Sequence, residues 1–250
     1  MDAWAALAAA NNARWCDVVC RSHGAKPRLD DTMWTSATRT PPLYPDAVTL
    51  IRSPSLPDLL ARIDASPGCS IKDSFSSLDF HLFGFAVLFE AQWVARTSPR
   101  SLPLHVGPTW DLVRDAASFA EWERAWRQNG GLEDLLRPDL LAVDTVSVLV
   151  ARMQDRVVAG GILNRAAGVV GISNMFWRSG TPSAAWSGLL GFADALLPGS
   201  TFVGYEKADG LHALEQHGFE PAGPLRVWIT GSGPKHAADI SIPLESDGRE

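Results

Sequence analysis

The sequence predicts an α+β protein whose main part is a mixed sheet flanked by helices. Three β-branched runs joined by short polar turns, 145–152, 156–164 and 169–177, predict consecutive antiparallel strands. An apolar helical segment, 183–196, separates them from a strand at 201–205, and such a crossover favours parallel pairing. With 250 residues, 46% of them hydrophobic and 20% charged, the chain can bury one large core or two modest ones.

The other elements follow from local patterns. The turns between the three strands are predicted around Gln154 and Asp155 and at Gly168. Before them we expect a strand at 110–114, a helix at 117–128 and a helical piece near Leu135; after them, a helix at 209–217 and a strand at 225–230.

The first 104 residues predict an α+β domain of their own. The expected order is a helix at 11–22 ended by Gly24, an irregular proline-rich stretch, a β-rich run at 47–51, a short helix at 56–65 and a strand at 83–95. Residues 98–103 are predicted to form the boundary of this domain. The predicted division is therefore 1–104, 105–235 and a C-terminal tail at 236–250.

Charge and hydropathy limit the partners. The formal net charge is −6, with 22 Lys and Arg against 28 Asp and Glu, which argues against DNA or another polyanion. The Ala-rich start carries Asp2 where a secretory signal carries positive charge, and no stretch approaches the roughly 20 apolar residues of a membrane span. We therefore expect a cytoplasmic protein with no membrane partner.

The three cysteines predict reduced thiols rather than a disulfide framework, because their number is odd and no secretion signal is predicted. Cys16, Cys20 and His23 share one face of a predicted helix, as zinc ligands could. No fourth ligand is obvious, and Trp15 and Val19 complete the same stripe. A buried apolar face is the preferred interpretation, and no metal site is predicted.

From Trp110 onward the order of elements resembles the GNAT (Gcn5-related N-acetyltransferase) fold. Three segments carry the resemblance: the start at 110–123, Val157-Val-Ala-Gly-Gly, and 211–228 with its Gly218-Phe219 turn. The chain looks like a divergent, actinobacterial-type member with a degenerate coenzyme A loop. The resemblance covers about half the chain and implies a splayed central sheet, open between the strands that end near Phe176 and Tyr205. It also allows the N-terminal domain to be a degenerate GNAT-like half that shapes the substrate cleft, by analogy alone.

The resemblance further implies acetyl-CoA or another acyl donor as co-substrate, with no permanently bound cofactor. In the family, a Gly-rich loop seats the donor's pyrophosphate on a helix N-terminus. Here that loop has a single glycine, Gly180, with Pro182 behind it. Arg178 either meets a phosphate or is solvated, and Ser183 is expected to cap the helix. Strand-end residues complete the predicted donor site: Met175 and Phe176.

The family's acid–base groups require substitutes. Leu214 stands where many members have the tyrosine that protonates the leaving thiolate, so Tyr205 is the nearest replacement. Glu206, or His212, could accept the amine proton. Ser173 and Asn174 interrupt an apolar strand and are expected to face the cleft, near backbone amides that polarise the acyl carbonyl. Each residue also has a structural interpretation. Tyr205 could be an ordinary strand aromatic and Glu206 a solvated carboxylate, and Ser173 or Asn174 could be hydrogen-bonded to a neighbouring loop.

Three further residues are candidate substrate contacts. Trp177, with Trp186, could wall an acyl pocket, although core packing is the safer assignment. Glu90, a carboxylate among aromatic residues, could anchor the substrate amine, because such a group should pair or function. Asp73 either faces the cleft or caps a helix near Ser74, and capping is preferred.

Three functions remain open. The first is an N-acyltransferase that moves an acyl group from acetyl-CoA or another acyl-CoA to a small-molecule amine. The second keeps the transfer but takes its donor from aminoacyl-tRNA or a carrier-protein thioester, and the acidic charge argues against tRNA. The third is a non-catalytic binding module with a GNAT fold.

Overall fold

The described residues are organised around one mixed sheet. The computed structural model describes residues 2–97 and 107–231, and its strands form an 11-stranded sheet of order β1-β2-β3-β4-β11-β5-β10-β9-β8-β7-β6. The strands of the N-terminal part are β1 (Arg28–Leu29), β2 (Met33–Thr35), β3 (Ala47–Thr49), β4 (Ser70–Asp73) and β5 (Phe85–Arg96). Those of the C-terminal part are β6 (Thr109–Leu112), β7 (Val146–Met153), β8 (Arg156–Ala166), β9 (Val169–Trp177), β10 (Phe202–Glu206) and β11 (Glu220–Thr230). The α+β class with a mixed sheet flanked by helices is confirmed.

One strand of the N-terminal part lies inside the C-terminal part of the sheet. β5 pairs antiparallel with β10 from Phe202–Arg96 to Glu206–Gln92, and antiparallel with β11 on its other edge. β4 continues the sheet beyond β11. The predicted division near residue 104 stays a prediction, since one sheet joins both parts and residues 98–106 lie outside the described residues, as does the tail at 236–250.

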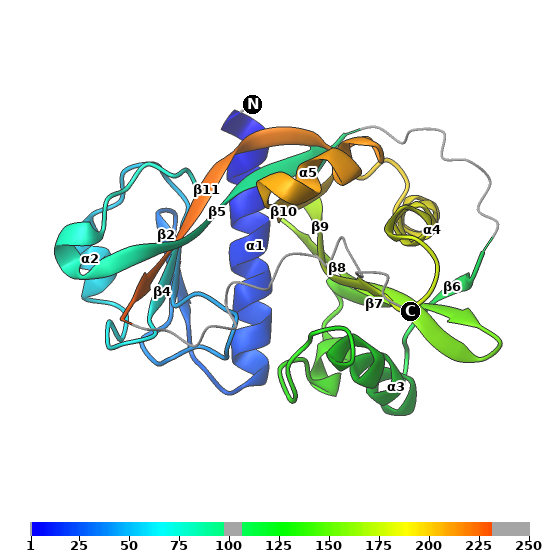
Figure 1. Ribbon diagram of the computed structural model, residues 1–250. Coiled ribbons are helices and arrows are strands. Elements are labelled where there is room, and N and C mark those ends of the chain that lie inside the picture. Colours follow the sequence, from blue (N-terminus) through cyan, green and yellow to red (C-terminus); the bar gives the residue numbers. More distant parts are fainter. Residues whose placement is uncertain (1, 98–106, 232–250) are drawn as a thin grey trace, which may run out of the picture.

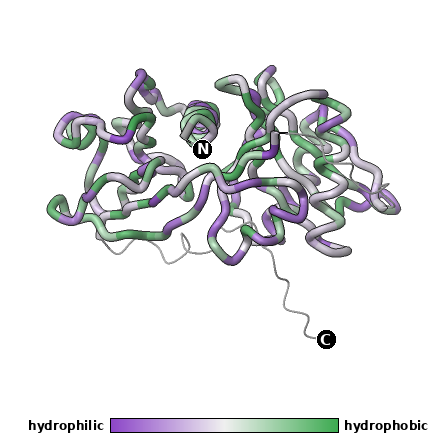
Figure 2. The backbone as a smooth tube through the Cα atoms, turned by 90° about the horizontal axis from the view of Figure 1, so that it is seen from above, coloured by the Kyte–Doolittle hydropathy of each residue, from purple (hydrophilic) through white to green (hydrophobic). Residues whose placement is uncertain are grey.

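The first helix, α1 (Asp2–Ser22), stands where the two lobes of the molecule meet (Figures 1 and 2). It begins nine residues before the predicted start at Asn11, because alanine has the highest helix propensity and the first ten residues are rich in it. Small buried side chains face the sheet and allow close packing: Ala5, Ala8, Ala9, Ala13, Cys16 and Cys20. Gly24, at φ 80°, ends the helix as predicted.

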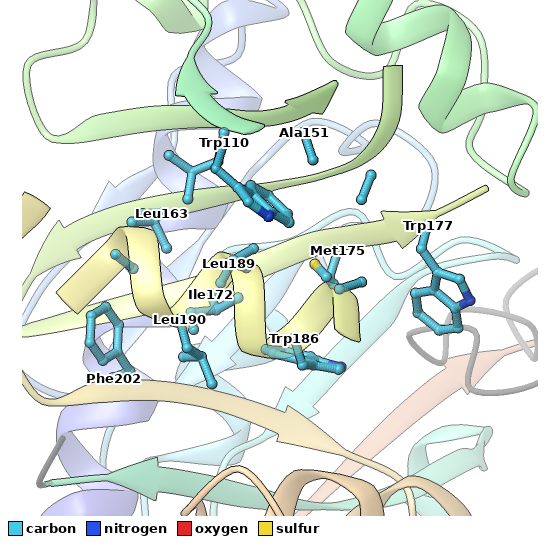
Figure 3. Close-up of a cluster of buried hydrophobic side chains, with 14 of the residues drawn as sticks. Trp110, Ala151, Leu163, Ile172, Met175, Trp177, Trp186, Leu189, Leu190 and Phe202 are labelled. Carbon is cyan, nitrogen blue, oxygen red and sulfur yellow. The ribbon is translucent and has the colours of Figure 1, made fainter. Parts of the chain in front are cut away.

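Helices cover both faces of the sheet. Besides α1 they are α2 (Leu56–Leu60), α3 (Ala116–Arg127), α4 (Pro182–Leu196) and α5 (Ala208–Glu215), with short 3-10 turns at His81–Phe83 and Pro138–Ala142. Alternate residues of β7 divide the core: Val148 and Val150 pack with α3 and α1, whereas Leu149 and Ala151 pack with α4 and α5. Figure 3 shows the second cluster, with Trp186 and Leu189 of α4 near Trp177 and Met175 of β9. We call these the α1 face and the α4 face.

The predicted turns are present, and two local predictions are wrong. Gln154 and Asp155 have φ of 50° and 61°, and Ala167 and Gly168 have 54° and 75°, as in two-residue hairpin loops. The segment near Leu135 is a turn, and the 3-10 helix begins only at Pro138. The helix expected after Asp73 is absent from the described residues, which instead place Asp73 at the end of β4. That prediction failed because an aspartate accepts hydrogen bonds from the backbone N–H groups that follow it both at a helix N-cap and in an Asx turn, so the sequence does not distinguish the two.

Candidate active site

Strands β9 and β10 are neighbours in the sheet but separate along their length. They pair in parallel at Phe202–Val170 and Val203–Gly171. Beyond that point β9 stays paired with β8 as far as Trp177, and β10 stays paired with β5 as far as Glu206. The two strands therefore diverge and present backbone edges to the gap between them, as the resemblance implied.

A bulge in β9 lies beside this gap. The register with β8 shifts between Phe176–Gly160 and Ser173–Ile162, and Asn174 has a φ of 52°. Bulges of this kind occur next to active sites, where they redirect a side chain or a backbone amide. The hydroxyl of Ser173 is buried and has no hydrogen-bond partner among the described residues. The bulge therefore brings an unused donor and a redirected backbone to the gap.

Two cavities open on the α1 face at this position. The gap cavity, about 150 Å³, is lined by residues 172–176 of β9, Tyr205 of β10, Asn12, Trp15 and Cys16 of α1, Lys72, residues 43–45, Trp126, residues 129–131 and Leu135. The N-terminal cavity, about 280 Å³, is lined by residues 39–46, Gly68, Ser70, Lys72, Leu88, Phe89, Leu132, Tyr205, Val227 and Ile229. Five residues line both cavities: Leu43, Tyr44, Pro45, Lys72 and Tyr205. The cavities are therefore adjacent and meet at Lys72 and Tyr205.

Lys72 is buried at this junction, with 4% of its surface exposed. Its ammonium donates to Oδ1 of Asn12 at 2.8 Å and lies 4.3 Å from the centre of the Tyr205 ring. No carboxylate among the described residues forms an ion pair with it. Trp93 meets the Tyr205 ring edge to face at 5.6 Å, and the Lys72 ammonium also lies 5.9 Å from the centre of the Trp93 ring.

The helix that carries Asn12 is attached to the β8–β9 hairpin by a buried amide pair. The Asn11 side chain donates to the backbone oxygens of Asn164, Ala166 and Val169 at 3.0 to 3.3 Å. The Asn164 amide donates in return to Oδ1 of Asn11 at 2.9 Å. Gly171 leaves room for this pair, since a Cβ there would lie 2.1 Å from Oδ1 of Asn11. The α1 wall of the gap cavity is thus held by specific hydrogen bonds.

Glu206 is buried on the opposite face from Tyr205. Neighbouring strand residues alternate, so Tyr205 lies with Val203 on the α1 face, while Glu206 follows Phe202 onto the α4 face. Its Oε1 accepts from the backbone N–H of Lys207 at 2.8 Å, and its Oε2 has no partner among the described residues. Burial raises the pKa of this carboxyl to about 7. Glu206 lies outside the lining of both cavities.

The amino end of α4 differs from the predicted phosphate site. Thr181, not Ser183, caps the helix: its hydroxyl accepts from the N–H of Ala184 at 3.1 Å. The prediction of Ser183 as the cap placed the start of the helix two residues too late, because the first helical residue is Pro182. Pro182 at the first helical position has no N–H, and Ala185 already donates to the Thr181 oxygen. Arg178 and Gly180 are exposed.

These observations test the fit of coenzyme A in two parts. The amide-bearing arm fits, because the gap presents a free strand edge and the unpartnered Ser173 hydroxyl. The diphosphate does not fit, because the first turn of α4 lacks the free backbone N–H groups that a Gly-rich loop would supply. Pro182 has no N–H, and the N–H of Ala184 is bonded to the Thr181 hydroxyl. Among the described residues no group of His, Cys, Asp and Glu could hold a metal ion.

The other predicted donor residues are distributed between the two faces. Met175 and Phe176 line the gap cavity, but their side chains belong to the cores of the α4 face and the α1 face, respectively. Trp177 and Trp186 are buried on the α4 face (Figure 3). The Trp186 ring there contacts the rings of His217 and Phe219. Both tryptophans lie outside the lining of the two cavities.

The predicted substrate contacts of the N-terminal part lie elsewhere. Glu90 forms an ion pair with Arg226 of the neighbouring strand and is largely exposed. The pairing and the exposure explain why a carboxylate is tolerated in this strand. Asp73 accepts from the backbone N–H groups of Phe75 and Leu78 and closes a turn, and burial raises its pKa. His212 is exposed beside Glu215. The structure thus brings Ser173, Asn174 and Tyr205 together, but not Glu90 or Asp73.

The cysteines of α1 lie in the apolar core. Cys16 and Cys20 pack with Ala13, Trp34 and Val48, and burial raises the pKa of the Cys16 thiol to about 11. A ring nitrogen of His23 contacts the Leu135 backbone oxygen at 2.9 Å. The preferred interpretation of this stripe as a buried face is confirmed.

Four polar residues of the gap cavity were missed as site residues: Asn12, Tyr44, Lys72 and Asn129. Lys72 is adjacent to Asp73, which the sequence made a candidate for the cleft, but Lys72 itself was not predicted as a site residue. Asn11 and Asn12 carried a signal, since two adjacent amides in an alanine-rich helix favour a specific partner over solvent. Nothing in the sequence placed residues 43–45 or 129–131 near β9.

Comparisons with known structures identify the fold. A GCN5-related N-acetyltransferase from Kribbella flavida superposes with a TM-score of 0.57 at 12% identity, over 90% of this chain and 96% of that one. A protein from Novosphingobium aromaticivorans named as an acetyltransferase of the GNAT family gives 0.52 at 12%, over 87% and 96%. A conserved protein of unknown function from Staphylococcus epidermidis gives 0.56 at 10%, over 82% and 94%. The chain has the GNAT fold, and the likeness extends through its N-terminal part.

The sequence comparisons add nothing to this. No family model matches the sequence, and no curated protein matches it either. Among the described residues, no helix is both long and apolar enough to cross a membrane.

Proposed function

We propose that this protein is an N-acyltransferase that moves an acyl group from a thioester donor to the amine of a small molecule. One observation carries the proposal: the gap between β9 and β10 opens directly into a cavity lined by Ser173, Asn174 and Tyr205. The gap supplies an edge for an amide-bearing donor arm, and the cavity has room for an acceptor. The GNAT fold of the chain agrees with this division of roles.

The chemistry requires three things of the chain. A neutral amine attacks the thioester carbonyl, so that a C–N bond forms and the C–S bond breaks. Backbone N–H groups of residues 174–176, with the Ser173 hydroxyl, are assigned to the developing oxyanion. Tyr205, whose ring lines the cavity, is assigned to protonate the leaving thiolate.

Glu206 is assigned to accept the amine proton through water. A pKa of about 7 suits a general base at neutral pH. Its position on the α4 face excludes direct contact with an acceptor on the α1 face, so water in the gap would have to relay the proton. Its unpartnered Oε2 supports such a role.

The donor is proposed as a thioester with an amide-bearing arm, either an acyl-CoA or a carrier-protein thioester. The first turn of α4 favours donors that do not depend on a diphosphate cradle. Aminoacyl-tRNA is the weaker option, given the net charge of −6.

Thiol release tests the proposal. The full chain is incubated with acetyl-CoA, longer acyl-CoAs or acyl-pantetheine and a panel of primary amines. We expect release with at least one pair, greatly reduced in Glu206→Gln and unchanged in Glu220→Gln, an exposed carboxylate at the start of β11. A bound donor at a hundred times its dissociation constant should also stabilise the fold by about 2.7 kcal/mol. Absence of both release and stabilisation with every donor would leave a binding module as the better description.

A further inference from the structure

Lys72 is the most unusual charged group on the α1 face. Lysine is almost never fully buried unless it is paired, yet Lys72 is 4% exposed and has no carboxylate partner among the described residues. Burying an unpaired ammonium is costly, and the ring of Tyr205 and the oxygen of Asn12 offset only part of that cost.

The ammonium retains bonding capacity that faces the cavities. It has three N–H donors, and one of them is used by Asn12. Because Lys72 lines both cavities, a ligand in either one can reach the remaining donors. An anionic ligand group would complete the charge pairing that the protein leaves open.

The surroundings of Lys72 indicate what is attached to that anion. On one side lies the gap cavity with Ser173 and Tyr205, where an amine would meet the acyl donor. On the other side, the N-terminal cavity is walled mainly by apolar side chains: Leu43, Leu88, Phe89, Leu132, Val227 and Ile229. Its one carboxylate, Asp46, is already bonded to Arg39, Thr40 and Ser70.

We propose that the acceptor is a small zwitterion of the amino-acid type, whose carboxylate pairs with Lys72 while its amine lies at the gap and its apolar side chain fills the N-terminal cavity. This inference rests on the proposed function for the role of the amine, but not for the binding itself. Asn12 orients the ammonium, and the Asn11–Asn164 pair fixes the helix that carries Asn12.

Binding is the test that does not depend on turnover. L-leucine, L-phenylalanine and L-methionine are each compared with their primary amides, which keep the size and amine but lack the carboxylate charge. Dissociation constants are measured by calorimetry on the full chain. For at least one pair we expect the acid to bind roughly tenfold or more tightly than the amide. Equal binding of acids and amides, or no binding of any acid, overturns the proposal.

Substitution assigns the preference to Lys72. In Lys72→Gln the acid-to-amide ratio should fall to about one, while Lys26→Gln, an exposed lysine beyond α1, should keep the wild-type ratio. A preference that survives in a folded Lys72→Gln variant overturns the assignment. If that variant does not fold, the wild-type ratio still decides. Acid-selective binding without any acyl transfer would sink the proposed function and leave this site standing.

Discussion

The Lys72 ammonium lies 4.3 Å from the centre of the Tyr205 ring and joins β4 of the N-terminal part to β10 beside the gap. Trp93 of β5 meets the same ring edge to face at 5.6 Å. The Tyr205 ring therefore forms a three-way cluster with Lys72 and Trp93, both from the N-terminal part. That part is needed to position the residue to which we assign proton donation.

Replacing Tyr205 with Phe should remove the proton donor and keep the packing. The phenylalanine ring keeps the contacts with Lys72 and Trp93, so the acceptor KM should change little. General acid catalysis contributes about 100-fold or more, and kcat should fall by that amount. Steady-state thiol release measures both constants. A variant with wild-type kcat would remove Tyr205 from the chemistry.

The contribution of Glu206 to stability should fall as pH rises. The carboxyl ionises near 4.5 when solvated and near 7 in the fold, so the folded state binds the extra proton between these values. The contribution of this carboxyl group to stability is therefore greatest below pH 4.5 and decreases up to pH 7, by roughly 3 kcal/mol at most.

The Glu206→Gln variant measures this effect. Glutamine cannot ionise, so the variant should gain stability relative to wild type as pH rises from 5 to 8, with the difference levelling off above about pH 7. Urea unfolding across this range gives the curve. A difference that does not depend on pH would mean that Glu206 ionises normally in the folded protein.

Much of the C-terminal part could be predicted because its signals are local. The hairpin turns at Gln154–Asp155 and Ala167–Gly168 require positive φ, and β-branched runs on either side define the strands. The N-terminal part was harder to predict. Strands β1 and β2 have only two and three residues, too few for a period to emerge. The placement of β5 between β10 and β11 depends on long-range pairing that no local pattern encodes.

The residues of the site that lie on β9 and β10 could be predicted from the pattern of each strand alone. Ser173 and Asn174 interrupted an apolar strand, and Tyr205 closed the next one, so both sides of the gap were found. Glu206 was predicted beside Tyr205 in the cleft, but strand alternation places it on the other face. Lys72 and Asn12 lie 130 and 190 residues before the first residue of β10, and only the tertiary structure brings them to the cavity.

Gly171 should be intolerant of any side chain. A Cβ there would lie 2.1 Å from Oδ1 of Asn11 and 2.4 Å from Oδ1 of Asn164. We expect Gly171→Ala to cost about 2 kcal/mol or more, because it separates the amide pair. Gly191→Ala, in α4 with nothing within 4 Å, should instead stabilise the protein by up to about 1 kcal/mol. Equal unfolding midpoints for the two variants would contradict this account of the pair.

Removing the Asp194 carboxylate should destabilise the fold far more than removing an exposed carboxylate from a similar ion pair. Arg96 is 1% exposed and forms a two-pronged bond with Asp194 of α4, at 2.9 and 2.8 Å. Asp194→Ala leaves a buried guanidinium unpaired and should cost about 3 kcal/mol. Glu121→Ala, which breaks the exposed pair with Arg152, should cost at most about 1 kcal/mol. Denaturant unfolding compares the two variants, and similar losses would show that water replaces the Asp194 carboxylate.

The capped first turn of α4 predicts how much of the donor the protein uses. Pro182 has no N–H, and Thr181 takes the amide of Ala184, so few groups remain for a diphosphate. The arm, in contrast, has the open edge of β9 and the Ser173 hydroxyl. Removing the nucleotide should therefore cost little: acetyl-pantetheine should be used with a kcat/KM within about tenfold of acetyl-CoA, a difference of about 1.4 kcal/mol. The same pair of donors with Arg178→Gln isolates the exposed guanidinium. Were acetyl-CoA preferred by several orders of magnitude, and that preference lost with Arg178, the loop would bind phosphate by its side chain instead of its amides.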